Sequence, residues 1–471
     1  MREGKTTLVH FLSQVGTSVA GFVATFAIAR LLGADGLGVY TLGLALLFWF
    51  NVPTTAIASA MNKRMSEGTD QGEFLSAGFV LNAGFGLLVL LLFLAFRPLV
   101  DGYVGAPVAG LVGLLVLVES MFAAVQNGLN GQKRVAASGL SLFAERVVRT
   151  LAQVVLVVLG FEVAGLFLGY VGSAVVGIAV GLVPYRVWFR RPSIEQFRRL
   201  LSYAQYAWLG KLKTRAFGWM DTIVLGFFVA PALVGIYEVA WNLSTMLILV
   251  SLSIQQTLFP ELSDLGTTDD YERIHHLLNE GLVFVGVFAV PGLFGAAIVG
   301  PRVLAIYRPE FATGAEVLLI LIAAQLVSAF ASQLLNVINA VDRADVAFRI
   351  NAVFLVVNVA LNVALVSAFG WVGAAVATGA SAVVTLVLSY AAVVSLVGAP
   401  DVPFGDIGFE VVAGAAMAVL VALAKPLAPV NHYATIGLVL LGACVYVLVL
   451  LGLSTRIRRK MLSLVPVAPT P

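Results

Sequence analysis

Residues 433–455, YATIGLVLLGACVYVLVLLGLST, form an uninterrupted apolar run that leads into a basic segment, RIRRK at residues 456–460. A helix rises about 1.5 Å per residue, so a run of this length crosses the roughly 30 Å of hydrocarbon in a bilayer. Working outward from this run, similar stretches recur near residues 8–32, 37–60, 74–97, 106–130, 137–160, 162–186, 203–229, 232–258, 275–299, 314–338, 347–369, 371–397 and 405–425. The sequence therefore predicts an all-α, polytopic membrane protein with fourteen transmembrane helices.

The composition agrees with this prediction and excludes several other classes of protein. Of the 471 residues, 60% are hydrophobic and 11% are charged, and the mean hydropathy is +0.99, whereas a soluble protein carries about 25% charged residues. A disulfide scaffold, a nucleic-acid-binding protein and a disordered tail are excluded. The loops between the runs leave no room for a soluble catalytic domain, and no motif for a nucleophile or a metal ligand set occurs. We expect a transporter without a cofactor or metal, rather than an enzyme.

The distribution of basic residues predicts the orientation of the chain. If the N-terminus lies inside, seventeen of the 28 Lys and Arg residues fall in inner segments and four in outer ones. Inner loops of membrane proteins carry such an excess of Lys and Arg. We therefore expect both termini on the cytoplasmic side of the cell membrane.

An internal repeat predicts the organisation into lobes. Gly38-Val39-Tyr40 reappears as Gly235-Ile236-Tyr237, and the loop at residues 130–134 is echoed at residues 339–343. Repeats of this kind in transporters enclose a substrate site and alternate its access. We expect two six-helix lobes, residues 1–190 and 203–398, joined by a linker or interfacial helix at residues 191–202. A C-terminal helix pair with a basic tail follows at residues 399–471.

Basic residues inside the predicted spans are candidates for a binding site. Each costs about 2.5–3.5 kcal/mol at the centre of a lipid-facing helix, so they are expected to line protein or a water-filled cavity. Those near mid-span are Arg146 and Arg149, in one stripe with Gln153 at i, i+3 and i+7, and Lys211 and Arg215 at i and i+4. Arg and Lys bind phosphate, which predicts an anionic cargo. Lys213, Arg30 and Arg349 are further members of this predicted cationic site.

Each of these basic residues also has a simpler interpretation. Arg146 and Arg149 could pair with Glu145 and Glu119 and join helices. The basic residues at 211–215 could form a collar at the inner surface if their helix starts later. Arg30 could extend its side chain to the outer interface, and Arg349 could anchor the inner end of its helix.

Acidic residues in the spans are candidates for ion coupling. Glu119, Glu145, Asp221 and Glu238 could bind H⁺ or Na⁺ during transport. A structural hydrogen bond or ion pair is the alternative for each of them.

Several motifs, in order along residues 29–378, resemble the Wzx-like polysaccharide-transport branch of the multidrug/oligosaccharidyl-lipid/polysaccharide exporter superfamily. They are Ala29-Arg30-Leu31-Leu32-Gly33 before Gly38-Val39-Tyr40, Asp221 before Gly235-Ile236-Tyr237, Pro260-Glu261-Leu262, Ile306-Tyr307-Arg308-Pro309-Glu310-Phe311, and NVALNVALVSAFGWVGAAVAT at residues 358–378. Arg308 stands where the family usually has Gly, a local departure.

The resemblance implies two six-helix lobes plus two helices around a V-shaped, cationic cavity. It also implies a flippase that moves an isoprenoid mono- or diphosphate-linked oligosaccharide from the inner to the outer leaflet. We expect membrane lipids and this substrate as partners, and a functional monomer. A drug or cation antiporter of the same fold, a membrane-embedded glycan polymerase or glycosyltransferase, and a lipid scramblase are the alternatives.

Overall fold

The computed structural model describes residues 2–268 and 270–464, and side chains at residues 22–208, 218–249, 251–268 and 270–459. The described residues form helices and connecting turns and contain no strand. The α-helices are α1 (Arg2–Phe50), α2 (Val52–Ser66), α3 (Gln71–Ala95), α4 (Arg97–Val104), α5 (Ala109–Gly131), α6 (Val135–Leu156), α7 (Glu162–Leu182), α8 (Ile194–Phe228), α9 (Pro231–Met246), α10 (Leu249–Thr267), α11 (Tyr271–Leu304), α12 (Ala315–Ala340), α13 (Ala344–Val397), α14 (Phe404–Ala424), α15 (His432–Leu453) and α16 (Thr455–Leu464). Short η segments occupy Val157–Phe161, Pro309–Gly314 and Lys425–Leu427.

Within the described part of the chain, nine helices are long and apolar enough to cross a membrane, or ten if the bent pair α9 and α10 counts as one span. Two of these nine are far longer than a bilayer is thick, at 48 residues for Val135–Leu182 and 54 for α13. The chain is a multi-pass membrane protein. Its count of fourteen spans stays a prediction.

Glycines break the longest helices. Gly370 lies inside α13 with φ 61°, and Gly160, between α6 and α7, has φ 90°. Both lie in the left-handed region that glycine adopts without steric cost. Beyond Gly370 the chain folds back on itself. This is shown by the hydrogen bond that Asn358 Nδ2 donates to Ser381 Oγ, 3.5 Å away on the other side of the break. Each break therefore produces a hairpin of two packed helical segments.

The helices bury small and polar residues and expose large apolar ones, the opposite of helices in a soluble protein. In α3, the buried positions include Gly72, Ser76 and Asn82, whereas Leu88 and Leu91 are more than half exposed. Small and polar residues on the packed face and large apolar ones outside are typical of helices in lipid. The same pattern recurs in α6.

The two copies of the predicted loop repeat share one backbone conformation. Lys133 and Asp342 have φ of 59° and 58°. The following residues, Arg134 and Arg343, donate their backbone N–H to carbonyls five residues earlier, at 2.9 and 3.1 Å. Each turn then begins a helix, α6 in one case and α13 in the other. This structural match supports an internal duplication.

The chain divides into two compact units. The N-unit is Ala24–Gly235, and the C-unit combines the chain before Ala24 with the chain after Gly235. This boundary does not coincide with the lobe boundaries expected from the helix order, and the lobes stay a prediction. Helix α8 starts in the expected linker, where Ser193 forms a capping box with Gln196, and continues unbroken to Phe228.

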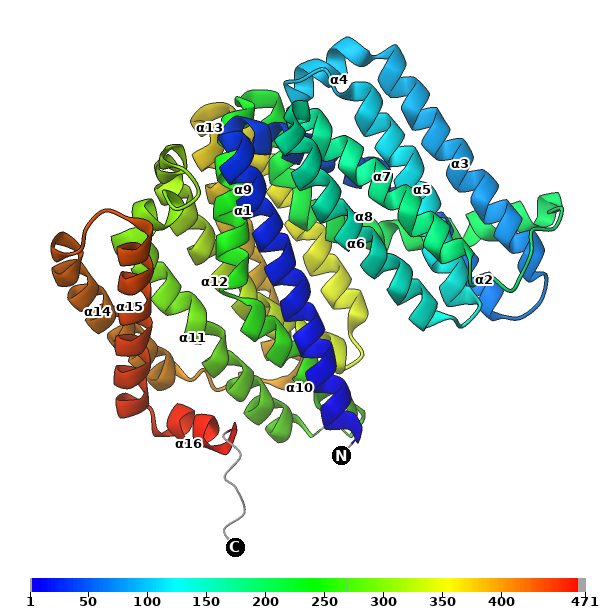
Figure 1. Cartoon of the computed structure of the whole chain (residues 1–471). Coiled ribbons are helices and arrows are strands. Elements are labelled where there is room, and N and C mark those ends of the chain that lie inside the picture. Colours follow the sequence, from blue (N-terminus) through cyan, green and yellow to red (C-terminus); the bar gives the residue numbers. More distant parts are fainter. Residues whose placement is uncertain (1, 269, 465–471) are drawn as a thin grey trace, which may run out of the picture. The chain divides into compact units, whose positions relative to one another are not determined.

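The N-unit is held together around α2, α3, α5 and α8, whose buried side chains include Met61, Phe74, Ala124 and Leu200. Helices α3, α5 and α7 lie side by side in Figure 1, where their colours run from blue through cyan to green. Gly38 and Gly235, the first residues of the two repeat motifs, contact each other within this unit, because a Cβ on Gly235 would lie 2.8 Å from Gly38 N. Only glycine permits this approach of two helices.

The C-unit has two main apolar clusters. One joins α10, α11, α12 and α13 through residues such as Leu278, Val337 and Ile350. The other joins α11 to the C-terminal hairpin of α14 and α15, drawn in brown and red in Figure 1, through Val283, Met417 and Leu438.

Candidate functional site

Helix α6 carries a polar face along its packed side. Ser138, Ser141, Glu145 and Gln153 are its buried residues, and they recur at helical spacing on one side of the helix. Leu140, Phe143 and Leu151 on the other side are 62%, 65% and 62% exposed. A helix with this distribution turns its polar groups toward protein and its apolar groups toward lipid. Of the sequence-predicted stripe, Arg149 and Gln153 lie on or beside this buried polar face.

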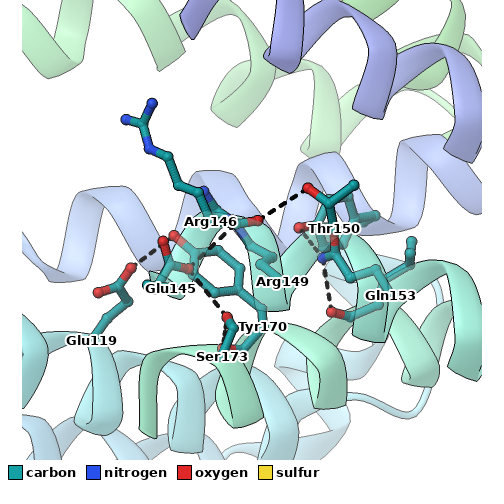
Figure 2. A network of polar contacts seen from close by, with 10 residues as sticks. Glu119, Glu145, Arg146, Arg149, Thr150, Gln153, Tyr170 and Ser173 are labelled. Atoms are coloured by element: carbon teal, nitrogen blue, oxygen red, sulfur yellow. Dashed lines mark hydrogen bonds and ion pairs between the residues drawn. The ribbon is translucent and has the colours of Figure 1, made fainter. Parts of the chain in front are cut away.

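Arg149 is the centre of a polar network in the N-unit, shown in Figure 2. Its Nε lies 3.4 Å from Glu145 Oε1, one turn earlier on α6, and the Glu145 side chain is 2% exposed. Its Cζ lies 4.3 Å from the ring centroid of Tyr170 on α7, a distance at which the guanidinium and the ring attract each other. The structure therefore pairs Arg149 with a carboxylate, as the structural alternative requires.

The network continues from Tyr170 to α5. The Tyr170 hydroxyl donates to Glu119 Oε1 at 2.8 Å, and the Ser173 hydroxyl lies 3.1 Å from Glu145 Oε1 as a donor. Three helices, α5, α6 and α7, thus meet through two carboxylates, one guanidinium and two hydroxyls. Such a connected network fixes the helices in one register.

A second contact links α6 to the first repeat motif. Gln153 Nε2 donates to the Tyr40 hydroxyl at 2.8 Å and to the Leu166 carbonyl at 3.0 Å. Tyr40 is 6% exposed and its ring packs against Phe167 with centroids 5.3 Å apart. The tyrosine of the Gly-Val-Tyr motif is therefore a structural element of the N-unit.

Arg146 differs from Arg149 in its surroundings. Arg146 is exposed, as is Thr150 one turn later. In Figure 2 the guanidinium of Arg146 points away from Glu145 and Arg149. At 100° per residue, Arg146 lies at the margin of the polar face, between Gln153 and Thr150. Because lipid is a costly environment for an arginine at mid-helix, this margin of α6 is expected to face water or protein rather than lipid.

The other predicted basic residues are not gathered into this network by the described structure. Arg30 is exposed and its Cζ lies 5.7 Å from the ring centroid of Phe26. Arg349 is 79% exposed and lies 3.9 Å from Asp345, one turn earlier in α13. The side chains of Lys211, Lys213 and Arg215 lie outside the described residues.

The four predicted acidic residues occupy different settings. Glu119 and Glu145 belong to the network just described. Asp221 on α8 is 8% exposed, and Glu238 on α9 accepts a hydrogen bond from Asn242 Nδ2 at 2.9 Å. No group of three His, Cys, Asp or Glu side chains among the described residues could hold a metal ion.

Sequence reasoning missed three residues that the structure places among buried polar groups. Tyr170 and Ser173 complete the α6 network, but tyrosine and serine on an apolar helix give no distinctive signal. Glu410 on α14 is 0% exposed, and a glutamate within the run 405–425 was a detectable signal.

Comparison with known proteins gives matches that cover most of the chain. The model of the polysaccharide biosynthesis protein family matches residues 4–266, more than half of the sequence. A Haloferax volcanii protein named "Probable flippase AglR" is 33% identical over 463 residues, which is 97% of each chain. A second protein of that organism, "Probable low-salt glycan biosynthesis flippase Agl15", is 27% identical over 386 residues, 82% of each chain.

Two solved structures share the fold. The lipid II flippase MurJ, in an inward closed conformation, matches with a TM-score of 0.76 and 15% identity over 96% of this chain and 100% of that chain. An inward-facing multidrug-resistance transporter of the MATE family, in the MOP superfamily, matches with a TM-score of 0.64 and 13% identity over 80% of this chain and 94% of that chain.

Proposed function

Because this chain belongs to the polysaccharide biosynthesis protein family, we propose that it is a flippase for an anionic, lipid-linked oligosaccharide. It is a membrane transporter rather than an enzyme. The proposed cargo carries an isoprenoid mono- or diphosphate and moves from the inner to the outer leaflet. Membrane lipids and this glycolipid are its proposed partners, and a monomer suffices for the proposed cycle.

The observation that carries the choice of an anionic cargo is the exposed Arg146 on a helix whose other large exposed side chains are leucine, valine and phenylalanine. A guanidinium has five N–H donors in a planar fork that fits the oxygens of a phosphate. Thr150, exposed one turn away, adds a hydroxyl next to it. A drug or cation antiporter of the same fold is expected to place acidic rather than basic residues beside its cargo.

Arg149 has a different proposed role. Glu145 and Tyr170 hold its guanidinium, so it fixes the orientation of α6 and thereby the position of Arg146. We propose that Lys211, Lys213 and Arg215 add positive charge to the same head-group site. Arg30 and Arg349 are assigned to anchoring, since the described contacts place them over Phe26 and beside Asp345.

The proposed mechanism is alternating access between two six-helix lobes, residues 1–190 and 203–398, with fourteen spans and both termini inside. The matching turns at Lys133 and Asp342 support a duplicated architecture. The breaks at Gly33, Gly160 and Gly370 support counting each of the long helical stretches as two spans. Asp221 and Glu238 stay proposed sites for a coupling H⁺ or Na⁺.

The test replaces Arg146 with Gln and measures the glycan that reaches the outer leaflet of cells that depend on this flippase. We expect export to be lost while the variant inserts in the membrane at the normal level. Arg349→Gln is the matched control, because it removes an exposed arginine from another helix, and it should export normally. The double variant Arg146→Gln/Arg149→Gln should also fail. Normal export by Arg146→Gln would refute the proposed head-group site.

A further inference from the structure

Glu410 on α14 is a buried carboxyl group without a partner among the described residues. The residue is 0% exposed, and neither of its carboxyl oxygens has a hydrogen-bond partner or an ion pair there. The hydroxyl of Tyr446 on α15 is buried and lacks a partner in the same way. Buried polar groups in proteins are nearly always paired, so two such groups in one helix bundle call for a specific explanation.

The surroundings of Glu410 are apolar and shaped to hold it. The carboxyl lies against the backbone of Gly286 on α11, because a Cβ on Gly286 would lie 2.0 Å from Glu410 Oε2. Ala413 and Met417, on the same face of α14, pack with Val283 of α11 and Leu438 of α15. A side chain at position 286 would displace the carboxyl group, so the glycine creates the space that Glu410 occupies.

An ionised carboxylate is untenable in this position. Moving an unpaired carboxylate from water into an apolar interior costs far more than a folded domain can supply, and such a group becomes neutral instead. Asp406, one turn earlier on the same helix, is also acidic and so offers Glu410 no compensating charge. We propose that Glu410 is a proton-binding site, with its carboxyl protonated when α11, α14 and α15 are packed as described here.

A polar cluster lies one helical turn from this site, at the end of the bundle. Asp406 precedes Glu410 by one helical turn, about 6 Å along the axis, and is 18% exposed. It lies 3.6 Å from Arg456 at the start of α16 and accepts from Ser454 Oγ at 2.9 Å. Arg456 also donates to Asn279 Oδ1 of α11 at 2.6 Å. This polar cluster marks the end of the bundle from which, in this proposal, a proton enters and leaves the site.

Charged or polar groups lie on each of the helices around Glu410. Helix α14 contributes Asp406, α15 contributes Tyr446, and α16 contributes Arg456, whose charge is taken up by Asp406. Helix α11 contributes Asn279 at the bundle end and the backbone of Gly286 beside the carboxyl. A proton gradient across the membrane can then act on the protein through Glu410, a consequence that rests on the proposed transport function.

Infrared difference spectroscopy on the purified full-length protein tests the proton site directly. At neutral pH we expect a carbonyl stretching band of a protonated carboxylic acid that is absent from Glu410→Gln and present in Glu310→Gln, which alters an exposed glutamate. Tyr446→Phe should shift this band without removing it. If Glu410→Gln instead loses bands of an ionised carboxylate, Glu410 is charged and the proposal is overturned. If the acid band of the wild type disappears when NaCl replaces choline chloride, the site binds Na⁺ in place of the proton, and the proposal is likewise overturned.

A second measurement does not depend on the assignment of bands. If Glu410 keeps its proton when folded and releases it when unfolded, the folding equilibrium constant falls about tenfold per pH unit where the two states differ by one proton. The wild type should therefore lose stability relative to Glu410→Gln as the pH rises. Parallel pH profiles for the two proteins would overturn the proton site. A glycan export rate that responds to a pH gradient equally in both proteins would overturn the coupling while leaving the site intact.

Discussion

The ion pair between Arg149 and Glu145 gives a prediction that separates a structural role from a substrate-binding one. Replacing Arg149 with Gln leaves Glu145 charged, 2% exposed and in contact with the hydroxyl of Ser173. Removing one partner of a buried ion pair costs about 3–5 kcal/mol. Because the Arg149 side chain is 27% exposed, water can partly replace it, and we expect a loss of about 3 kcal/mol, at the lower end of that range. The folding equilibrium constant should fall more than about a hundredfold.

A double-mutant cycle measures the coupling between the two side chains. Glu145→Gln/Arg149→Gln removes both charges, so its stability should recover to within about 1 kcal/mol of the wild type. Arg149→Lys keeps the charge but loses the contact of the guanidinium with the Tyr170 ring, which should cost about 1 kcal/mol. Unfolding in mixed micelles can be followed by the fluorescence of the six tryptophans. Equal destabilisation of the single and double variants would refute a pairwise role for these residues.

Two further predictions test the fold and its orientation. Gly38→Ala places a Cβ 1.7 Å from the Pro231 carbonyl oxygen. Because the backbone cannot move aside as a side chain can, we expect a loss of about 3 kcal/mol of stability and a low yield of folded protein on size-exclusion chromatography. Gly84→Ala, with no atom within 4 Å of the new Cβ, is the control and should fold normally; a normal yield from both variants would contradict the close helix contact. In a Cys444→Ser background, Ser66→Cys should react with an impermeant maleimide only after the membrane is opened and Val430→Cys should react in intact cells, whereas the reverse pattern would show the opposite orientation.

The sequence predicted the helical, membrane-spanning character of the chain because that property depends on composition and period alone. It also placed Arg149 and Gln153 on one side of a helix, since the i, i+4 relation is local. It could not decide whether Arg149 is paired, because that depends on Tyr170 and on the rotation of α6 against α7. Tyr170 is 21 residues away along the chain, and only the turn at Gly160 brings it into contact.

Glu410 shows the converse limitation. A glutamate inside an apolar run is visible in the sequence, but its lack of a partner is a property of the packed bundle. The space it occupies depends on Gly286, a residue of a different helix that carries no functional group of its own. Likewise, the contact between Gly38 and Gly235 requires tertiary structure, although the repeat that contains both glycines is recognisable in the sequence.

The composition of the α6 network bears on how an electrical potential could act on the proposed cycle. Glu119, Glu145, Arg146 and Arg149 together carry no formal net charge. An electric field does no net work when a neutral set of side chains shifts along the membrane normal, whereas each added negative charge is worth about 2.3 kcal/mol per 100 mV. Under the proposed function, a potential that is negative inside therefore pushes the anionic cargo outward, and movement of the neutral α6 network adds no electrical work of its own. Any effect of voltage on the return of the empty protein comes instead from charges outside this network, such as Lys211, Lys213 and Arg215.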